Sequence, residues 1–158
     1  MKTKYSGLMV AAMVLLTAFS AQSQEVAERD GKYYGQDGMV FTGDLRATGT
    51  DGRLHSIHTV VAGVLAGPVT YYDESGQVEE TGYYADGRKH GVWKQFNASG
   101  RQTGEATYVN GQKDGVWTVW DDQGVKRYHM VYSMGRKIDT WQIWDEHSNL
   151  VSERVYGN

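Results

Sequence analysis

Residues 91–114 read GVWKQFNASGRQTGEATYVNGQKD and contain every part of a repeating unit. Val92 to Phe96 and Arg101 to Val109 are short runs with the aromatic and β-branched residues that are typical of strands. The first run is followed by Asn97-Ala98-Ser99-Gly100 and the second by Asn110-Gly111, and both are turn sequences. The stretch therefore predicts two strands joined by tight turns, with no room for a helix.

The unit recurs every 24 residues, from Gly43 through Gly67, Gly91 and Gly115 to Asp139. A fixed period of this length indicates a repeat array, in which each unit buries apolar surface only against its neighbours. We therefore predict an all-β fold, an elongated antiparallel meander of stacked β-hairpin repeats with about five units. The columns that we assign to this structure hold Trp93, Trp117 and Trp141; Tyr84, Tyr108 and Tyr132; Gly76, Gly100 and Gly124; and Gly87, Gly111 and Gly135.

The N-terminal residues have the composition of a targeting segment. Lys2 and Lys4 precede an apolar run from Gly7 to Phe19, and Ala21-Gln22-Ser23 supplies the small residues of a cleavage site. We expect residues 1–23 to be a secretory signal peptide, the alternative being an uncleaved membrane anchor. This assigns residues 24–42 to an N-terminal lead with a partial repeat and residues 43–158 to the repeat domain. The expected location is periplasmic, outer-envelope or extracellular.

Composition limits the partners. Loss of the signal peptide removes Lys2 and Lys4, which leaves 14 of the 16 basic residues and all 19 acidic ones. The net charge of the remaining chain is then −5 with histidine neutral. The chain has no block of Lys and Arg, so nucleic-acid binding lacks its electrostatic footprint. No second apolar stretch is long enough to span a membrane, and the absence of cysteine excludes disulfides.

The turns also suggest a register. A loop of Gly111 to Asp114 that closes at Gly115 would pair Tyr84 with Trp93, Tyr108 with Trp117, and Tyr132 with Trp141. Across the other turn we expect Trp93 opposite Gly104 and Trp117 opposite Tyr128, or one residue away if Gly100 or Gly124 forms a bulge. Trp117 and Trp120 are three residues apart, so either the sheet is aromatic on both faces or a bulge rotates one of them.

The pattern Gly-Val-Trp-x-x-aromatic-Asp/Asn-x-x-Gly, followed by a Tyr-containing strand and Asn/Asp-Gly-x-Lys, resembles MORN-type repeats, and most closely their bacterial variant. The match runs from about Gly43 to Asn158 and is strongest from Gly67 to Trp144, for example in YYADGRKHGVW and YVNGQKDGVW. The resemblance implies one β-hairpin per repeat in an elongated sheet. Bacterial proteins with this repeat are often described as antitoxin-like, and eukaryotic ones are linked to membrane tethering and scaffolding. It implies no catalytic residues.

Metal and cofactor sites have weak support. His55 and His58 have metal-like spacing, but residues three apart on a strand point to opposite faces, and no third ligand is near. The acidic turn column is better explained by side chains that cap backbone N–H groups than by calcium, which needs several oxygen ligands in each loop. This column holds Asp73, Asn97, Asp121 and Asp145. We predict no metal and no cofactor.

Catalytic motifs are also missing, because the chain has no GxSxG, HExxH or Walker-type loop. We therefore expect no enzymatic activity. The remaining candidate is a second aromatic column, which would bind a partner if it faces solvent. Its members are Tyr72, Phe96, Trp120 and Trp144.

Three functions remain open. The first is an exported, non-enzymatic scaffold that binds another protein or an envelope component. The second is a carbohydrate-binding module that stacks sugar rings on the second aromatic column, and the third is an antitoxin-like protein. A homodimer through the open sheet edges is a further expectation.

Overall fold

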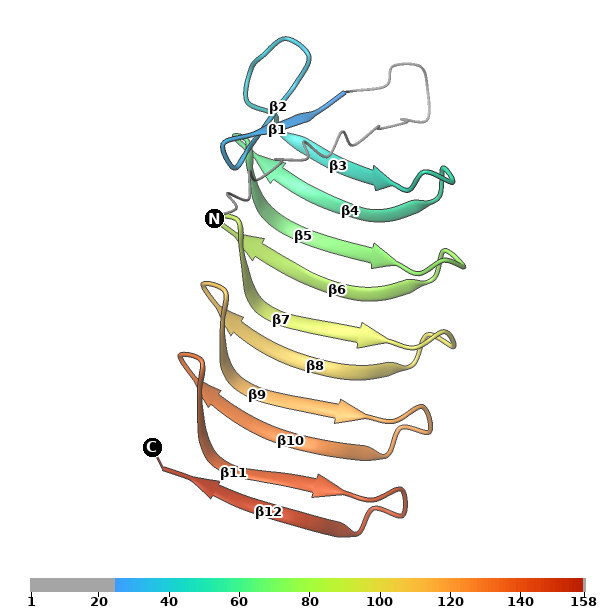
Figure 1. The fold of residues 1–158 in the computed structure, drawn as a ribbon, viewed down its shortest axis with the longest axis vertical. Coiled ribbons are helices and arrows are strands. Elements are labelled where there is room, and N and C mark those ends of the chain that lie inside the picture. Colours follow the sequence, from blue (N-terminus) through green and yellow to red (C-terminus); the bar gives the residue numbers. More distant parts are fainter. Residues whose placement is uncertain (1–24, 158) are drawn as a thin grey trace, which may run out of the picture.

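The computed structural model describes residues 25–157, and within them every regular element is a β-strand (Figure 1). The predicted signal peptide, residues 1–23, lies outside the described residues. The strands are β1 (Ala27–Arg29), β2 (Lys32–Tyr34), β3 (Gly43–Thr48), β4 (Leu54–Val61), β5 (Val64–Tyr72), β6 (Val78–Ala85), β7 (Arg88–Phe96), β8 (Gln102–Val109), β9 (Gln112–Trp120), β10 (Lys126–Ser133), β11 (Arg136–Trp144) and β12 (Leu150–Tyr156).

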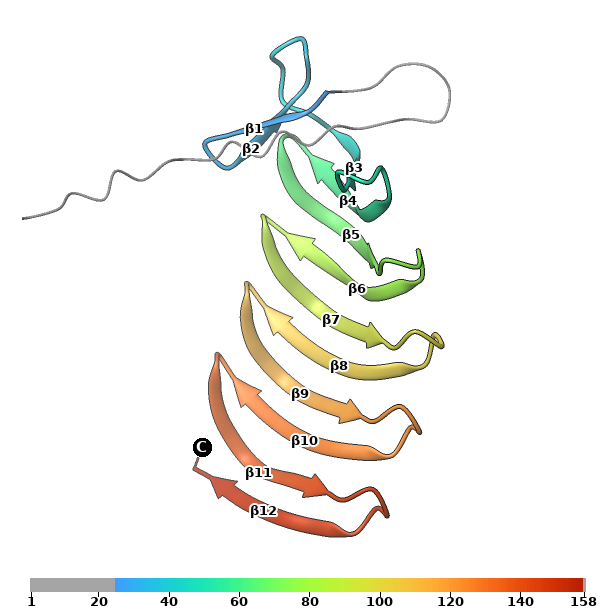
Figure 2. The same cartoon turned by 45° about the vertical axis from the view of Figure 1, so that its right-hand side comes forward.

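The strands from β3 to β12 form one open antiparallel sheet in which each strand pairs with the next in the chain. Every 24-residue unit contributes two strands, so the five hairpins stack along the long axis of the molecule (Figure 1). The strands are bowed in a common direction, as the turned view shows (Figure 2). The predicted all-β meander of stacked hairpin repeats is confirmed.

The hairpin turns between units are tighter than predicted. Asn110 and Gly111 have φ values of 50° and 84°, and Asp86-Gly87 and Met134-Gly135 repeat this conformation. Two central residues with positive φ define a two-residue type I′ hairpin, which suits the twist of the flanking strands. Tyr108 therefore pairs with Lys113, and the predicted Tyr108–Trp117 pairing is wrong. Tyr84 and Tyr132 likewise pair with Lys89 and Lys137.

The residues assigned to a longer loop form a bulge within the next strand instead. Ala106 pairs with Trp117 and Tyr108 with Lys113, so Asp114, Gly115 and Val116 lie opposite Thr107 alone. Gly115 takes a φ of 93°, a conformation that costs glycine little because it has no Cβ. A glycine in this column thus bends the strand and does not close the turn.

The turns within units are capped by their first side chain. The Oδ1 atom of Asp73 accepts hydrogen bonds from the backbone N–H groups of Ser75 (2.8 Å) and Gln77 (2.9 Å). Asn97, Asp121 and Asp145 make the same pair of bonds in their own turns. The prediction that this column caps turns is confirmed.

The register that follows these turns differs from the prediction. Trp93 lies opposite Ala106 and Trp117 opposite Met130, two residues beyond the expected partners Gly104 and Tyr128. The pairing shifts after the turn, where Gln95 pairs with Gly104 but Phe96 pairs with Gln102. The first pair beside the turn is offset by one residue from the expected register. The bulge that follows adds one more residue, which gives the total offset of two.

The N-terminal end of the sheet carries a small hydrophobic core. Val26, Phe41, Leu45 and Val60 are buried together, with Tyr33 and Leu65 packed against them. The β1–β2 hairpin is tied to this end by the Tyr33 N–H, which donates to the Gly63 carbonyl at 2.9 Å. This end of the sheet is therefore covered, whereas β12 at the other end is an edge strand with mostly exposed side chains.

Candidate binding surface

One face of the sheet carries an unbroken row of aromatic rings, and we call it the ladder face. Ring centroids are 5.2 Å apart for Tyr84 and Trp93, 5.2 Å for Tyr108 and Trp117, and 5.0 Å for Tyr132 and Trp141. Spacings of this kind are favourable for aromatic pairs. The row begins at His58 and continues through Tyr71, Tyr84, Trp93, Tyr108, Trp117, Tyr132 and Trp141 to Tyr156.

The bulges hold the tryptophans in this row. The Nε1–H of Trp117 donates to the backbone carbonyl of Thr107 at 3.1 Å, and the bulge leaves Thr107 without a regular partner in β9. Trp93 and Trp141 donate in the same way to the residues ten positions earlier, Tyr83 (3.2 Å) and Val131 (3.0 Å). Each indole N–H thus gives a hydrogen-bond partner to a backbone carbonyl at the point where the pairing of the two strands is irregular. Although the predicted register is wrong, the predicted Tyr–Trp contacts exist, because each tyrosine reaches its tryptophan across the bulge.

Burial along the row depends on the residue that faces each tryptophan. Trp93 is only 2% exposed, since Gly82 beside it has no side chain and the indole occupies that space. The equivalent neighbour of Trp117 is Ala106, and both of these residues are half-buried. Trp117 is therefore more open to solvent than Trp93.

Lysines lie over the tryptophans of the last three units. The Nζ atoms of Lys89, Lys113 and Lys137 are 3.7, 4.0 and 4.5 Å from the ring centroids of Trp93, Trp117 and Trp141, respectively. These distances fit cation–π interactions. Lys89 also pairs with Glu80 at 3.4 Å. One and two units earlier the same column holds the aliphatic Leu65 and the aromatic Phe41, which pack in the N-terminal core.

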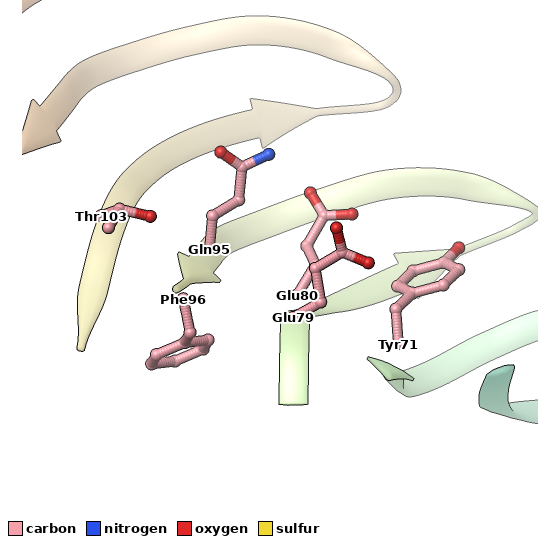
Figure 3. A pocket seen from close by; sticks show the side chains of 6 residues that line it. All are labelled: Tyr71, Glu79, Glu80, Gln95, Phe96 and Thr103. Atoms are coloured by element: carbon pink, nitrogen blue, oxygen red, sulfur yellow. The ribbon is translucent and has the colours of Figure 1, made fainter. Parts of the chain in front are cut away.

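The second aromatic column lies on the other face, which we call the opposite face. Figure 3 shows Phe96 and Gln95 leaving β7 in opposite directions, with Glu80 and Tyr71 on the side of Gln95. The sheet is thus aromatic on both faces, the first of the two predicted arrangements. All four members of the column, Tyr72, Phe96, Trp120 and Trp144, are half-buried.

Two exposed apolar side chains of the opposite face stand beside this column. Val92 and Val116 are 48% and 46% exposed, and each lies four residues before a member of the column. The Nζ atom of Lys126 is 4.1 Å from the ring centroid of Trp144, so a lysine also covers one ring of this face.

A hollow of about 340 Å³ opens beside the row, lined by Tyr71, Glu79, Glu80, Gln95, Phe96 and Thr103 (Figure 3). The Tyr71 and Tyr84 hydroxyls are hydrogen-bonded at 3.1 Å, and burial together with this bond raises the pKa of Tyr71. The Glu80 carboxylate forms an ion pair with Lys89. The hollow therefore offers hydroxyl, amide and carboxylate groups around the end of the aromatic row.

The histidines with metal-like spacing are not brought together. His58 lies in the aromatic row, where its Nε2 atom is 2.9 Å from the Ser56 hydroxyl and burial lowers its pKa. His55 is exposed and lies at a bulge of the same strand, where the pairing with β3 skips from Ser56 to Leu54. Within residues 25–157, no group of three His, Asp or Glu side chains is arranged to hold a metal ion.

Residues 65–86, from β5 to the turn after β6, match the family described as "MORN repeat variant". The chain is a MORN-type repeat protein. The matched segment contains the capped turn at Asp73 and ends at the type I′ turn of Asp86-Gly87, so it covers one structural unit of this MORN-type array. This geometry recurs at intervals of 24 residues outside the matched segment as well.

Other comparisons add little to this assignment. No curated protein matches the chain. One solved structure, described as "Crystal structure of GtfA/B complex bound to UDP and GlcNAc", aligns with 96% of this chain at 9% identity and a TM-score of 0.30. The MORN-type chain spans 28% of that protein's length. In the described part of the chain, no helix has the length and apolarity needed to cross a membrane.

Sequence reasoning missed the position of the lysine column over the aromatic rings of the MORN-type array. The signal was present, because Lys89, Lys113 and Lys137 recur with the period of the repeat. The predicted register placed these lysines in loops, whereas the two-residue turns place them in strands opposite Tyr84, Tyr108 and Tyr132.

Proposed function

We propose that this protein is an exported, non-enzymatic scaffold that binds another protein or an envelope component. The observation that carries the proposal is the open sheet, one layer thick, with a periodic aromatic row on each face. Within residues 25–157 no second sheet or helix packs across the ten strands, and the β1–β2 hairpin lies at the N-terminal end (Figures 1 and 2). Apolar surface left open in this way is typical of interaction sites.

The opposite face is the proposed contact for a protein partner. Trp120 and Trp144 present half-buried indoles, and Val92 and Val116 add exposed aliphatic surface in the neighbouring column. Aromatic residues at the centre of an apolar patch are the residue types that dominate binding energy at protein interfaces. The repeat allows the contact to extend over several units, so a partner gains from each one.

Export is supported by the sequence of residues 1–23, and the lack of enzymatic activity is proposed from the missing catalytic motifs. An antitoxin-like role would require a toxin that reaches the same compartment. That alternative predicts a neighbouring gene for an exported toxin, and it loses its support if the genome has none.

Capture from an envelope extract tests the proposal. The full chain is expressed in a host that processes it, and its mature N-terminus is determined by mass spectrometry. A Trp120→Ala/Trp144→Ala variant serves as the comparison after circular dichroism and thermal unfolding show that it is folded. We expect a protein that is captured by the unmodified chain and lost with the variant, and that binds again when purified.

Failure to capture any envelope component with the unmodified chain contradicts the proposal. Capture that is indifferent to the two tryptophans leaves the scaffold role in place but removes the opposite face as its site. An uncleaved N-terminus contradicts the predicted signal peptide and supports a membrane anchor.

Carbohydrate binding is a second candidate, and the aromatic row of the ladder face favours it. Sugar rings stack on aromatic side chains, and this row extends over several units of the array. Quenching of tryptophan fluorescence by polysaccharides is the simplest test, and the absence of quenching with any of them counts against the candidate.

A further inference from the structure

We propose that the ladder face binds an anionic polysaccharide of the uronic-acid type, laid along the long axis of the sheet over Lys89, Lys113 and Lys137. This inference rests on the proposed binding function and names the chemical class of an envelope component that the ladder face recognises. It concerns the face that does not carry Trp120 and Trp144.

The charge of this row points to an anionic ligand. Among the described residues, Lys113 and Lys137 have no carboxylate within 4.0 Å, whereas Lys89 is paired with Glu80. Lys137 and Arg154 are exposed, and both cations lie over the Tyr156 ring, at 5.5 and 5.1 Å from its centroid. The chain as a whole has a net charge of −3, so this row of cations is a local feature of one face.

The spacing of the lysines points to a ligand that itself repeats. Each unit contributes two strands, and strands lie about 4.8 Å apart, so successive lysines are about 9.6 Å apart along the sheet. Two pyranose units in an extended chain have a similar length. A polymer of identical acidic sugars therefore offers a carboxylate to each lysine in turn, without any change of register.

The rings beside the lysines provide the second part of the recognition. Tyr128 and Ile143 are 42% and 37% exposed, and together with Met130, Trp141, Arg154 and Tyr156 they line a hollow next to Lys137. The C–H faces of sugar rings pack on such aromatic and aliphatic surface, while lysine donates hydrogen bonds to the carboxylates. A neutral glycan would use the rings and leave the ammonium groups unmatched.

Polygalacturonate is the probe, and its fully methyl-esterified form is the control without charge. Titrations use the mature protein as the host produces it, with binding followed by calorimetry and tryptophan fluorescence. We expect binding to polygalacturonate, at least ten-fold weaker binding to the esterified polymer, and a loss of affinity at about 0.5 M NaCl because salt screens exposed charges.

Two pairs of substitutions with the same change in charge separate the faces. Lys113→Gln/Lys137→Gln removes two cations from the ladder face and should weaken binding at least ten-fold. Lys94→Gln/Lys126→Gln removes two from the opposite face, where Lys94 pairs with Glu105 and Lys126 covers Trp144, and should change it less than three-fold. Lys113→Arg/Lys137→Arg keeps the charge and should retain binding, which guards against a purely structural effect.

Equal losses from the two glutamine pairs would show non-specific attraction and overturn the proposal, as would equal binding of the esterified polymer. Equal or tighter binding of polyglutamate would assign the face to an acidic peptide instead. No binding of polygalacturonate by the unmodified protein overturns the inference alone if envelope capture succeeds. If both experiments fail, the proposed function fails as well.

Discussion

The Nζ atom of Lys113 lies 4.0 Å from the centre of the Trp117 ring, four residues further along the same strand. Residues four apart on a strand share a face, and the bulge at Gly115 bends β9 between these two so that the ammonium group reaches the ring. The same lysine is 4.9 Å from the ring centroid of Tyr132 in the neighbouring strand. One cation therefore contacts rings from the two neighbouring strands β9 and β10.

Lys113→Gln should lower the free energy of unfolding by about 0.5–1 kcal/mol, because the cation–π contact with Trp117 is lost. Lys113→Arg should leave it nearly unchanged, since the guanidinium also stacks on aromatic rings. Urea unfolding monitored by circular dichroism measures both. A Lys113→Gln variant as stable as the unmodified protein would show that the contact contributes nothing to folding.

Gly82→Ala should destabilise the fold by about 1–3 kcal/mol, a typical cost of overpacking. A methyl group at this position would overlap the indole of Trp93, which is 2% exposed. We also expect a red shift of tryptophan fluorescence as Trp93 moves outward. Gly104→Ala is the control and should cost less, because its methyl group meets the flexible Gln95 side chain. Equal effects would contradict the account of Trp93 burial.

Stability should fall as the solution is acidified through the range in which the turn carboxyls titrate. Hydrogen bonds from Ser75 and Gln77 lower the pKa of Asp73, and those from Asn149 and His147 lower that of Asp145. A carboxyl with a depressed pKa in the folded state stabilises the fold above its unfolded pKa, and this contribution is lost as the pH falls through the folded pKa.

The matched variant for this effect is Asp73→Asn, because Asn97 caps the equivalent turn with the same two backbone hydrogen bonds. It should keep the turn and reduce the dependence of the urea midpoint on pH below about 4. Asp73→Ala should lower the midpoint at neutral pH as well. A pH dependence identical in Asp73→Asn and the unmodified protein would exclude Asp73 as a contributor.

The edge strand β12 is the expected site of a homodimer, because an unpaired edge presents free backbone groups to a second chain. Val155→Lys places a charge at a side chain that is 73% exposed on this strand. We expect a lower dimer fraction in sedimentation analysis and an unchanged melting temperature. A dimer that persists unchanged must use another surface.

The repeat columns allowed the fold to be predicted, because the turn residues carry their own geometry. The Asp73 side chain caps the turn within its own unit. The backbone of Asn110-Gly111 readily takes the positive φ values of a type I′ hairpin. Both features depend on local chemistry alone. The register of the strands was harder to predict from the sequence. Gly115 fits a turn or a bulge equally well by sequence, and only pairing with the neighbouring strand decides between them.

The candidate site was predicted in part. The contacts of the Tyr–Trp row follow from the period, but which ring is buried depends on a neighbour in another strand, as Gly82 shows for Trp93. The role of Lys113 depends on the same bulge. A regular column of lysines is visible in the sequence, but its position over the rings is a product of the register.

Radical footprinting of the intact protein tests the central claim, that the open sheet is a binding surface, most directly. Oxidation of Trp and Tyr side chains is compared by mass spectrometry in buffer and in envelope extract. We expect protection in extract of Trp120 and Trp144, or of exposed ladder-face residues such as Tyr128, while Trp93 stays unreactive in both. Rings that are equally reactive in extract and in buffer would contradict it.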